Sequence, residues 1–405
     1  MTALCRAIRE TKIESYFGRK IALDASMAMY QFMIATRIGD GTVTLTNADG
    51  EVTSHLSGLL SRTIRMLEVG IKPVWVFDGK APDLKRGELD RRKEKRAEAS
   101  AALDAAKEAG DEDEIKAQAK RLVSVTKEMN DDAKKMLRLM GVPVIESATE
   151  AEAQCAVLCK AGKVYGVGSE DMDTLTFGST KLIRNLNRSE ALKLPVLEIS
   201  LDSVLEDLKM TMDQFIDLCV LMGCDYCGTI KGVGPKKAFE LISEHGSIEK
   251  ALTKIDREKF TVPDNFEQDI VPVHEFFVHP EVRDVETIEL KWTDPDEDGL
   301  LQFLCDEKQF NRDRITKSLE KIKKSRGTAT QVCNLCKDSL NHSFNWFVFQ
   351  GRLESFFGAS VLTKRKEAVH TFSFTLSSLV CLILFQDIKG SKPDSKKAKP
   401  GPKKK

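Results

Sequence analysis

VWVFDG, residues 74–79, is an apolar run that ends on an aspartate. The run is typical of a buried strand, and Asp78 stands where that strand ends. An Asp-Gly pair by itself is a common turn. Two other stretches repeat the pattern, because IALDAS ends its apolar run at Asp24 and VYGVGSEDMD carries Asp171 and Asp173 after another. Three strands that each end in acid indicate one shared site.

The segments around these acids alternate between strand and helix. SHLSGLLSRTIRMLEVG (54–70) has apolar residues at helical spacing and lies between the IALD and VWVFD strands. The pattern resumes with VPVIES (142–147) as a strand, EAEAQCAVLCKAG (150–162) as a helix and KVYGVGSED (163–171) as a strand. Strand, helix, strand is the unit of a parallel sheet. The sequence therefore predicts an α/β fold with a central, mostly parallel, twisted sheet flanked by helices.

Three other regions have a different composition. Residues 84–140 are dense in charge, rich in Ala, Lys and Glu, and broken at Gly110, which predicts two long, solvated helices. Residues 285–325 also read as helical and charged. Beyond about residue 326 the periodicity is lost, which predicts a disordered tail. The tail ends in IKGSKPDSKKAKPGPKKK, with eight lysines against one aspartate, as in a nuclear localisation signal or a nucleic-acid contact.

The composition limits the class of protein. In 405 residues, an apolar content of 41% and a charged content of 31% are typical of a globular protein with solvated helices. Ten cysteines without a signal peptide indicate a reduced intracellular protein. Zinc would need a further pair of ligands beside Cys224/Cys227 or Cys333/Cys336. LSSLVCLILF (376–385) is about half as long as a membrane-spanning helix, so we expect no membrane partner.

The acids suggest a metal site. In a parallel α/β sheet, ligands bind beyond the carboxyl ends of the strands. Unpaired carboxylates held close together repel one another, which a divalent cation relieves, and oxygen ligands without His or Cys favour Mg²⁺ or Mn²⁺. The carboxylates that can converge are Asp24, Asp78, Glu150, Glu152, Asp171, Asp173 and Asp225. Seven are too many for one magnesium and suit two ions roughly 4 Å apart, which clamp both oxygens of an in-line phosphoryl displacement.

Asp171 and Asp173 also admit another chemistry. DMDTL after a strand resembles the Asp-x-Asp motif of Mg²⁺-dependent aspartate-nucleophile phosphatases, in which one Asp is phosphorylated and the other is the acid or base. That motif usually continues with Thr or Val where this chain has Leu175. It also leaves Glu150, Glu152 and Asp225 without a role.

KGVGPKKA, residues 231–238, favours nucleic acid. Gly232 and Gly234 form a Gly-x-Gly turn before a basic helix, where backbone N–H groups can bind a phosphate and Lys236 and Lys237 add charge. The turn follows the predicted helix that carries Asp225, which is the arrangement of a helix-hairpin-helix DNA clamp. Metal-dependent phosphodiester cleavage beside such a clamp is the chemistry of a nuclease.

Four stretches closely resemble the eukaryotic flap endonucleases, which belong to the structure-specific 5′ nuclease superfamily. Their residues are similar to those of plant members. The four stretches are FGRKIALDASMAMYQF, TSHLSGLLSRTIRMLEVGIKPVWVFDGKAPDLKRGEL, SEDMDTLTFG and GCDYCGTIKGVGPKKA, and the similarity covers about residues 13–328. The resemblance implies a nuclease that removes 5′ flaps from branched double-stranded DNA at Okazaki fragments and in long-patch base-excision repair. It also implies 5′→3′ exonuclease activity and two Mg²⁺ per active site, for which Mn²⁺ can substitute.

The resemblance also implies roles for single residues. All seven acids match the family's metal ligands, and Lys85 and Arg92 match the catalytic pair that steers the scissile phosphate. These two stand at the base of the charged hairpin, which would be the helical arch that the flap threads. The positions expected to contact DNA are Tyr30, Arg37, Arg62, Glu150, Gly223 and Asp225, together with Gly232, Gly234, Lys236 and Lys237. QGRLESFF (350–357) resembles the box that docks on the trimeric sliding clamp, PCNA, through Gln350, Leu353, Phe356 and Phe357.

These assignments divide the chain and predict its location. We expect an enzyme of the nucleus, in the nucleolus and nucleoplasm, with the mitochondrion as a second location. We expect its core to be monomeric. The expected parts are an N-terminal nuclease block (1–96), the arch or spacer (97–113), an internal nuclease block with the helix-hairpin-helix (114–245), a C-terminal helical part of the core (246–328) and the tail (329–405) with its basic segment (389–405).

Three stretches depart from the family pattern. The family opens with Met-Gly-Ile-x-Gly-Leu and a short helix near the metal site, whereas this chain opens with MTALCRAIRETKIESYFG. We therefore expect weaker cleavage, with a catalytically weak DNA- and clamp-binding splice form as the alternative. Residues 332–350 and 370–386 interrupt the family's tail and read as insertions of the kind that a retained intron encodes.

Overall fold

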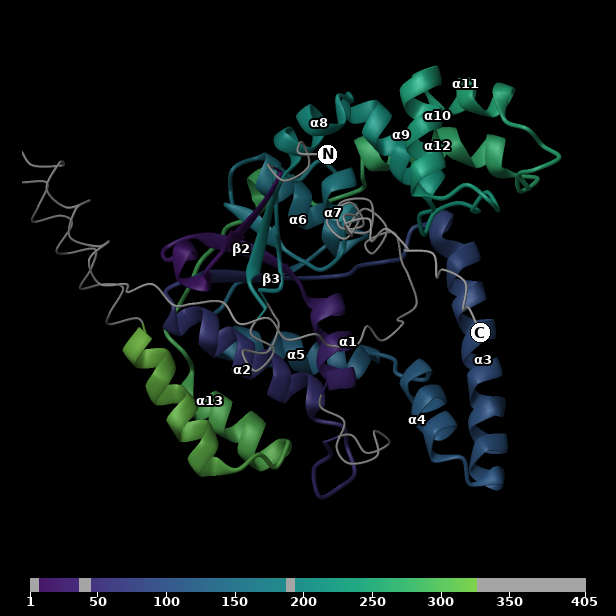
Figure 1. Cartoon of the computed structure of the whole chain (residues 1–405). Coiled ribbons are helices and arrows are strands. Elements are labelled where there is room, and N and C mark those ends of the chain that lie inside the picture. The colour runs from purple at the N-terminus through teal and green to yellow at the C-terminus, as the bar shows by residue number, and fades with distance from the viewer. Residues whose placement is uncertain (1–6, 36–44, 187–193, 326–405) are drawn as a thin grey trace, which may run out of the picture.

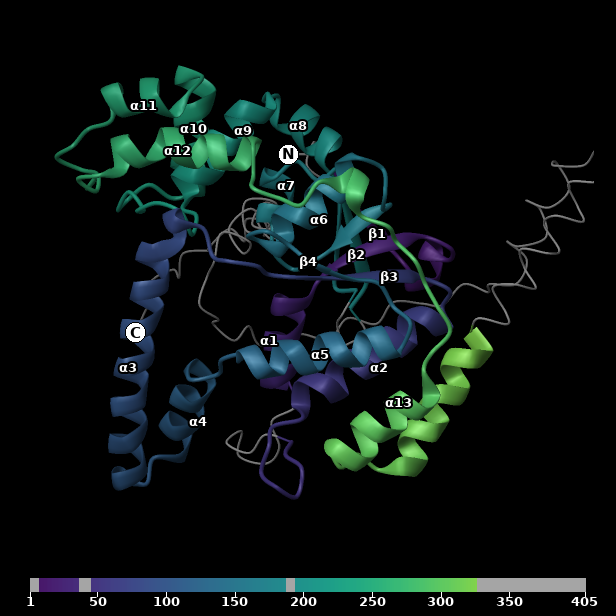
Figure 2. The same ribbon diagram turned by 180° about the vertical axis from the view of Figure 1, so that it is seen from behind.

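The computed structural model describes residues 7–35, 45–186 and 194–325. A central sheet carries helices on both faces, and a long helical projection stands to one side (Figures 1 and 2). Arg37, the second Cys-x-x-Cys pair, the sliding-clamp box and the basic segment at 389–405 lie outside the described residues. In the part that is described, no helix is long and apolar enough to cross a membrane.

The sheet has seven strands in the order β1-β7-β6-β5-β2-β3-β4. Strands β6, β5, β2, β3 and β4 are parallel. At one edge, β7 pairs antiparallel with β6, and β1 pairs antiparallel with β7. The prediction of a mostly parallel sheet is confirmed. The strands are β1 (Ile8–Thr11), β2 (Lys20–Asp24), β3 (Lys72–Phe77), β4 (Val144–Glu146), β5 (Gly166–Gly168), β6 (Lys181–Arg184) and β7 (Val196–Ser200).

Helices cover both faces of the sheet. The α-helices are α1 (Ala25–Ala35), α2 (Ser54–Glu68), α3 (Arg86–Ala109), α4 (Glu112–Arg121), α5 (Lys127–Leu139), α6 (Ala151–Lys160), α7 (Asp173–Thr176), α8 (Leu201–Leu208), α9 (Met212–Met222), α10 (Pro235–His245), α11 (Ile248–Lys254), α12 (Phe266–Val278) and α13 (Glu297–Leu301). Residues 312–325 are also helical. Short 3₁₀ turns span Ile13–Tyr16, Asp83–Lys85 and Val285–Thr287, and a π-helical turn spans Gln302–Glu307.

The alternation of side chains along β2 and β3 explains the two-sided core. Leu23 and Trp75 point to the face that α1, α2 and α5 cover, and both are fully buried. Ala22 and Val74 point to the opposite face and pack against α6. Successive strand residues point to opposite sides of a sheet, so a strand between two helical layers must be apolar throughout. Asp24 is the last residue of β2, where this apolar pattern stops.

The charged region at 84–140 differs from the prediction, because it forms three helices rather than two. The break at Gly110 is confirmed, with its backbone in the left-handed region at φ +71°. A second break precedes Thr126, whose hydroxyl accepts a hydrogen bond from the N–H of Met129 and caps α5. Helix α5 packs on the core through buried residues such as Met136, whereas α3 and α4 project from the body.

Two other regions also differ from the prediction. Strands β1, β6 and β7 form the antiparallel edge and its neighbour, and their mixed polar and apolar residues gave no clear strand signal. Between the 3₁₀ turn at Val285–Thr287 and α13, residues 288–296 form no helix, so the prediction of helix over 285–325 is wrong for this segment. The extended segment instead packs on the sheet, where Trp292 Nε1 donates a hydrogen bond to the carbonyl of Pro73 at 3.0 Å.

Candidate active site

The predicted acids follow the carboxyl ends of neighbouring parallel strands. Asp24 is the last residue of β2 and pairs in register with Val76, two residues before Asp78. Asp171 and Asp173 follow β5, which pairs with the other side of β2. Because parallel strands end at the same edge, these acids lie together.

The other three acids come from helices that border this edge. Glu150 is the N-cap residue of α6, and Glu152 lies in the first turn of that helix. Asp225 lies in the turn that follows α9. The acids differ in exposure, because Asp24, Glu150 and Asp173 are buried, Glu152, Asp171 and Asp225 are half-buried, and Asp78 is exposed.

The Asp-Gly pair that ends VWVFDG has a specific cause. Gly79 passes so close to the segment before α6 that a Cβ would lie 2.2 Å from the carbonyl oxygen of Ser147. Its N–H donates to the carbonyl of Thr149 at 2.7 Å. This approach brings Asp78 to the N-terminus of α6, where Asp78 Oδ1 accepts a hydrogen bond from the N–H of Ala151 at 2.8 Å. The glycine thus permits the contact that joins Asp78 to the helix of Glu150 and Glu152.

The pKa shifts show that the carboxylates interact. Burial, with the charges of Asp78 and Asp171, raises the pKa of Asp24 to about 8. Burial and the charges of Asp171 and Asp24 raise the pKa of Glu152. Burial and nearby charges, Asp171 and Asp225 among them, raise the pKa of Asp173. If all of these carboxylates were ionised, the acidic edge would hold more negative charge than its surroundings compensate.

Two cations partly compensate this charge. Lys85 Nζ lies 2.7 Å from Glu150 Oε2 and 3.6 Å from Asp225 Oδ2. Arg92, on the second turn of α3, donates to Asp225 Oδ2 at 2.8 Å. Burial opposes the charged form of Lys85, but the carboxylates of Glu150, Glu152 and Asp225 outweigh it and raise the pKa of Lys85. The structure thus brings both predicted cations to the acids, at the base of the helical projection.

The remaining hydrogen bonds fix the acids and leave oxygens unused. Asp24 Oδ1 accepts from the N–H of Met27 at 3.2 Å, and Asp171 Oδ1 accepts from the N–H of Asp173 at 3.0 Å. Asp173 Oδ1 is buried and has no hydrogen-bond partner among the described residues. A buried carboxylate oxygen without a partner is unfavourable unless a ligand satisfies it.

These features fit divalent cations with oxygen ligands. Within the described ranges, no three residues of Asp, Glu, His and Cys are close enough to enclose a single ion by themselves. Magnesium keeps several waters and takes only one or two carboxylates directly, so it needs no closed protein cage. The unsatisfied Asp173 oxygen and the mutually raised pKa values are the observations that support a cation at this edge.

The predicted DNA clamp lies next to the same edge. Helices α9 and α10 pack together, and the turn between them carries Asp225 at its start and Gly232 and Gly234 at its end. Gly232 adopts φ +92°, and Gly234 is the N-cap of α10. Figure 1 shows α9 and α10 above the N-terminal end of α3.

The other predicted DNA-contacting positions are dispersed. Lys236 is exposed on the first turn of α10, and Lys237 pairs with Glu240 at 3.2 Å. Tyr30 is 40% exposed on α1, the helix that follows Asp24, so its ring is available for stacking. Arg62 lies on α2, with its guanidinium 6.0 Å from the ring centre of Phe32.

Two features of the site are not among the residues predicted from the sequence. Tyr226, beside Asp225, is buried against Phe177, Phe276 and Phe277, and the Lys85 ammonium lies 5.7 Å from its ring centre. Tyr226 therefore helps to fix the position of Lys85. Cys224 and Cys227, considered only as zinc ligands, contact each other. The sequence signal for this contact is the Cys-x-x-Cys spacing, which places the two cysteines three residues apart in a turn.

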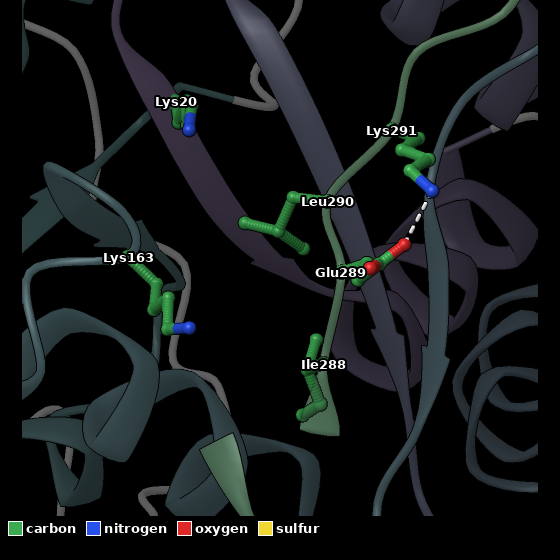
Figure 3. Close-up of a pocket in the computed structure, with 6 residues that line it drawn as sticks. All are labelled: Lys20, Lys163, Ile288, Glu289, Leu290 and Lys291. Carbon is green, nitrogen blue, oxygen red and sulfur yellow. Dashed lines mark ion pairs between the residues drawn. The ribbon is translucent and has the colours of Figure 1, made fainter. Parts of the chain in front are cut away.

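A shallow pocket of about 320 Å³ lies at the other end of the sheet (Figure 3). It is lined by Lys20, Lys163, Ile288, Glu289, Leu290 and Lys291. Lys20 begins β2 and Asp24 ends it, so the pocket opens near the amino ends of the strands. It contains none of the predicted site residues.

Two family models match the chain. Residues 2–99 match the XPG N-terminal domain and residues 141–225 match the XPG I-region. Flap endonuclease 1 of Danio rerio is 54% identical over 363 residues, which cover 89% of this chain and 90% of the relative. Flap endonuclease 1 of Glycine max is 52% identical over 368 residues, with the same coverage.

Solved structures give the same picture of the fold. The flap endonuclease-1 from Methanococcus jannaschii superposes with a TM-score of 0.62 and 34% identity, covering 79% of this chain and 96% of that one. The catalytic core of Rad2 in complex with DNA substrate superposes with a TM-score of 0.60 and 26% identity, covering 79% of this chain and 97% of that one.

Proposed function

Because this chain belongs to the flap endonuclease family, we propose that its acidic edge hydrolyses DNA phosphodiesters with two bound magnesium ions. The chain is a structure-specific 5′ nuclease, and its substrate is branched DNA with a 5′ flap. The observation that carries the proposed chemistry is the convergence of seven carboxylates with Lys85 and Arg92 at one edge of the sheet.

The family is one of metal-dependent nucleases, and we assign the metal here as Mg²⁺, with Mn²⁺ as a substitute. The residues that would hold the ions are Asp24, Asp78, Glu150, Glu152, Asp171, Asp173 and Asp225. When bound, two such ions would lower the pKa of the attacking water and stabilise the leaving oxygen. The hydrogen bonds from Met27 to Asp24 and from Ala151 to Asp78 hold these carboxylates in fixed orientations before the ions bind.

Lys85 and Arg92 are proposed to bind the scissile phosphate. In the protein alone they neutralise Glu150 and Asp225. With cations bound at these acids, Lys85 and Arg92 would be free to donate hydrogen bonds to the phosphate oxygens. Charge-assisted donors at such a position stabilise the negative charge that develops in the transition state.

The turn after α9 is proposed to align the duplex. The N–H groups at Gly232 and Gly234 and the ammonium groups of Lys236 and Lys237 suit a phosphate backbone, which they would bind without reading its sequence. This turn also contains Asp225, so a duplex bound by the turn would be held at a fixed position relative to the acids. Tyr30 would stack on a base, and Arg37, Arg62 and Gly223 would contact the same substrate.

The wider role proposed for the chain is Okazaki-fragment maturation and long-patch base-excision repair in the nucleus. The family membership supports this role, together with 5′→3′ exonuclease activity. The box at 350–357 would bind the sliding clamp, and the basic segment at 389–405 would direct nuclear import. Both proposals rest on the sequence.

One assay separates this function from the phosphatase alternative. A labelled 5′-flap duplex and a phosphomonoester are each incubated with the protein, with and without Mg²⁺. We expect Mg²⁺-dependent cleavage of the flap and no release of phosphate from the monoester. Turnover of the monoester alone would support the aspartate-nucleophile chemistry of Asp171 and Asp173 and overturn the nuclease proposal.

A further inference from the structure

The turn that carries Asp225 also contains two thiols. The Sγ atoms of Cys224 and Cys227 lie 3.6 Å apart. Both residues are half-buried and lie at the margin of the core. The contact with Cys227 and burial raise the pKa of the Cys224 thiol, whose sulfur lies against that of Cys227.

The backbone geometry suits a covalent bond between these sulfurs. Residues three apart across a tight turn have Cα atoms less than about 7 Å apart, which overlaps the range of about 4.4–6.8 Å found in disulfides. A disulfide needs sulfurs about 2.05 Å apart, so the two atoms must approach by about 1.5 Å. Cys155 and Cys159, by contrast, are buried one turn apart along α6.

We propose that Cys224 and Cys227 are a redox modification site that forms an intramolecular disulfide by exchange with a low-molecular-weight disulfide. The two thiols lose two protons and two electrons as their S–S bond forms. The reagent's S–S bond breaks and takes them up, so that it leaves as two thiols. A dithiol reductant reverses the reaction.

The consequence for activity rests on the role proposed for Asp225, which lies between the two cysteines. Asp225 accepts a hydrogen bond from Arg92 at 2.8 Å and lies 3.6 Å from Lys85, so the turn connects the acids with the base of the arch. A displacement of about 1 Å at a catalytic group can lower a rate by on the order of 100-fold. We expect the disulfide form to cleave flap DNA on the order of 100-fold more slowly in single-turnover assays, and reductant to restore the rate.

The experiment treats the full chain with oxidised glutathione and compares each sample with its own reduced form. After alkylation, trypsin releases the peptide Met210–Lys231, which contains Cys219, Cys224 and Cys227. In the oxidised sample, this peptide should lack the mass of two hydrogen atoms and carry the alkyl group only on Cys219. Peptide mapping also distinguishes this bond from any bond at Cys333 and Cys336.

Three variants make the test specific. Cys224→Ser and Cys227→Ser each lack one partner of the bond, so each should cleave equally well before and after glutathione treatment. The comparison uses protein that mass spectrometry shows to carry no glutathione on the remaining cysteine. Cys305→Ser, a half-buried cysteine far along the chain, should stay as sensitive as the unmutated protein. If either turn variant is inactive when reduced, the other variant and the peptide map still decide the outcome.

Two results would overturn the proposal. One is the absence of the Cys224–Cys227 bond in the peptide map, and the other is an unchanged cleavage rate in protein that has formed it. Both differ from a failure of the proposed nuclease function, which would appear as missing Mg²⁺-dependent flap cleavage in the reduced protein before any oxidant is added.

Discussion

Magnesium binding at different pH values tests whether the acidic edge is a cation site. Burial and the charges of Asp78 and Asp171 raise the pKa of Asp24 from its ordinary value of 3.8 to about 8. At pH 6, therefore, Asp24 carries a proton in the metal-free fold. A cation that uses this carboxylate must displace the proton, so binding becomes weaker as the pH falls.

The magnitude follows from that single group. With a pKa near 8, the proton weakens cation binding about 100-fold at pH 6 and about twofold at pH 8, a difference of about 2 kcal/mol. The pKa values of Glu152 and Asp173 are also raised, so the full effect should be larger. At pH 7, binding should release close to one proton from Asp24.

The same shift predicts how the metal-free protein responds to pH. A raised folded-state pKa favours the protonated carboxyl in the fold, so the contribution of Asp24 to stability is present at low pH. That contribution is lost as the pH rises from about 4 to about 8. Magnesium should offset the loss, so its stabilising effect in thermal unfolding should increase across this interval.

Isothermal titration calorimetry in two buffers of different ionisation enthalpy gives both the affinity and the number of protons released. Asp24→Asn is the matched variant, since it keeps the size of the side chain and cannot titrate. Its magnesium affinity should be weak and should depend less on pH. Proton release of zero, with an affinity that is equal at pH 6 and pH 8, would show that Asp24 is not a ligand of the cation.

Two further predictions concern the cations and the tail. Lys85→Ala and Arg92→Ala should each raise the activation free energy of single-turnover cleavage by roughly 3 kcal/mol, because each removes a charge-assisted donor. Lys291→Ala, at the pocket on the opposite end of the sheet, should leave the rate unchanged. Equal rates in all three variants would remove both cations from the catalytic set. Phe356→Ala/Phe357→Ala should abolish pull-down of the sliding clamp without altering nuclease activity, and undiminished pull-down would show that the box has no such role.

The acidic edge could be predicted because its signal is local. An apolar run followed by an acid, as at Asp24 and Asp78, marks the end of a buried strand. Parallel pairing then aligns these ends, so the sequence needs only the strand direction to bring the acids together. The same reasoning applies to Asp171, which follows the short strand β5.

The parts that were missed depend on contacts between distant residues. Strands β1 and β7 pair with each other across the chain and have polar residues on their exposed side, so neither has the apolar run of a central strand. The pairing of Lys85 with Glu150 joins residues 65 positions apart. In the charged region, the start of α5 at Lys127 is marked only by the capping hydroxyl of Thr126, which the dense charge pattern obscured.

The most direct test of the proposed metal chemistry is single-turnover cleavage of a 5′-labelled flap duplex by Asp171→Asn. The variant keeps an oxygen that can accept the hydrogen bond from the N–H of Asp173, so the local fold should persist. It lacks one negative charge that two magnesium ions need. We expect cleavage to be abolished while the affinity for flap DNA stays largely intact, since the variant keeps the residues proposed to bind phosphate. Cleavage at the unmutated rate would contradict the two-metal assignment.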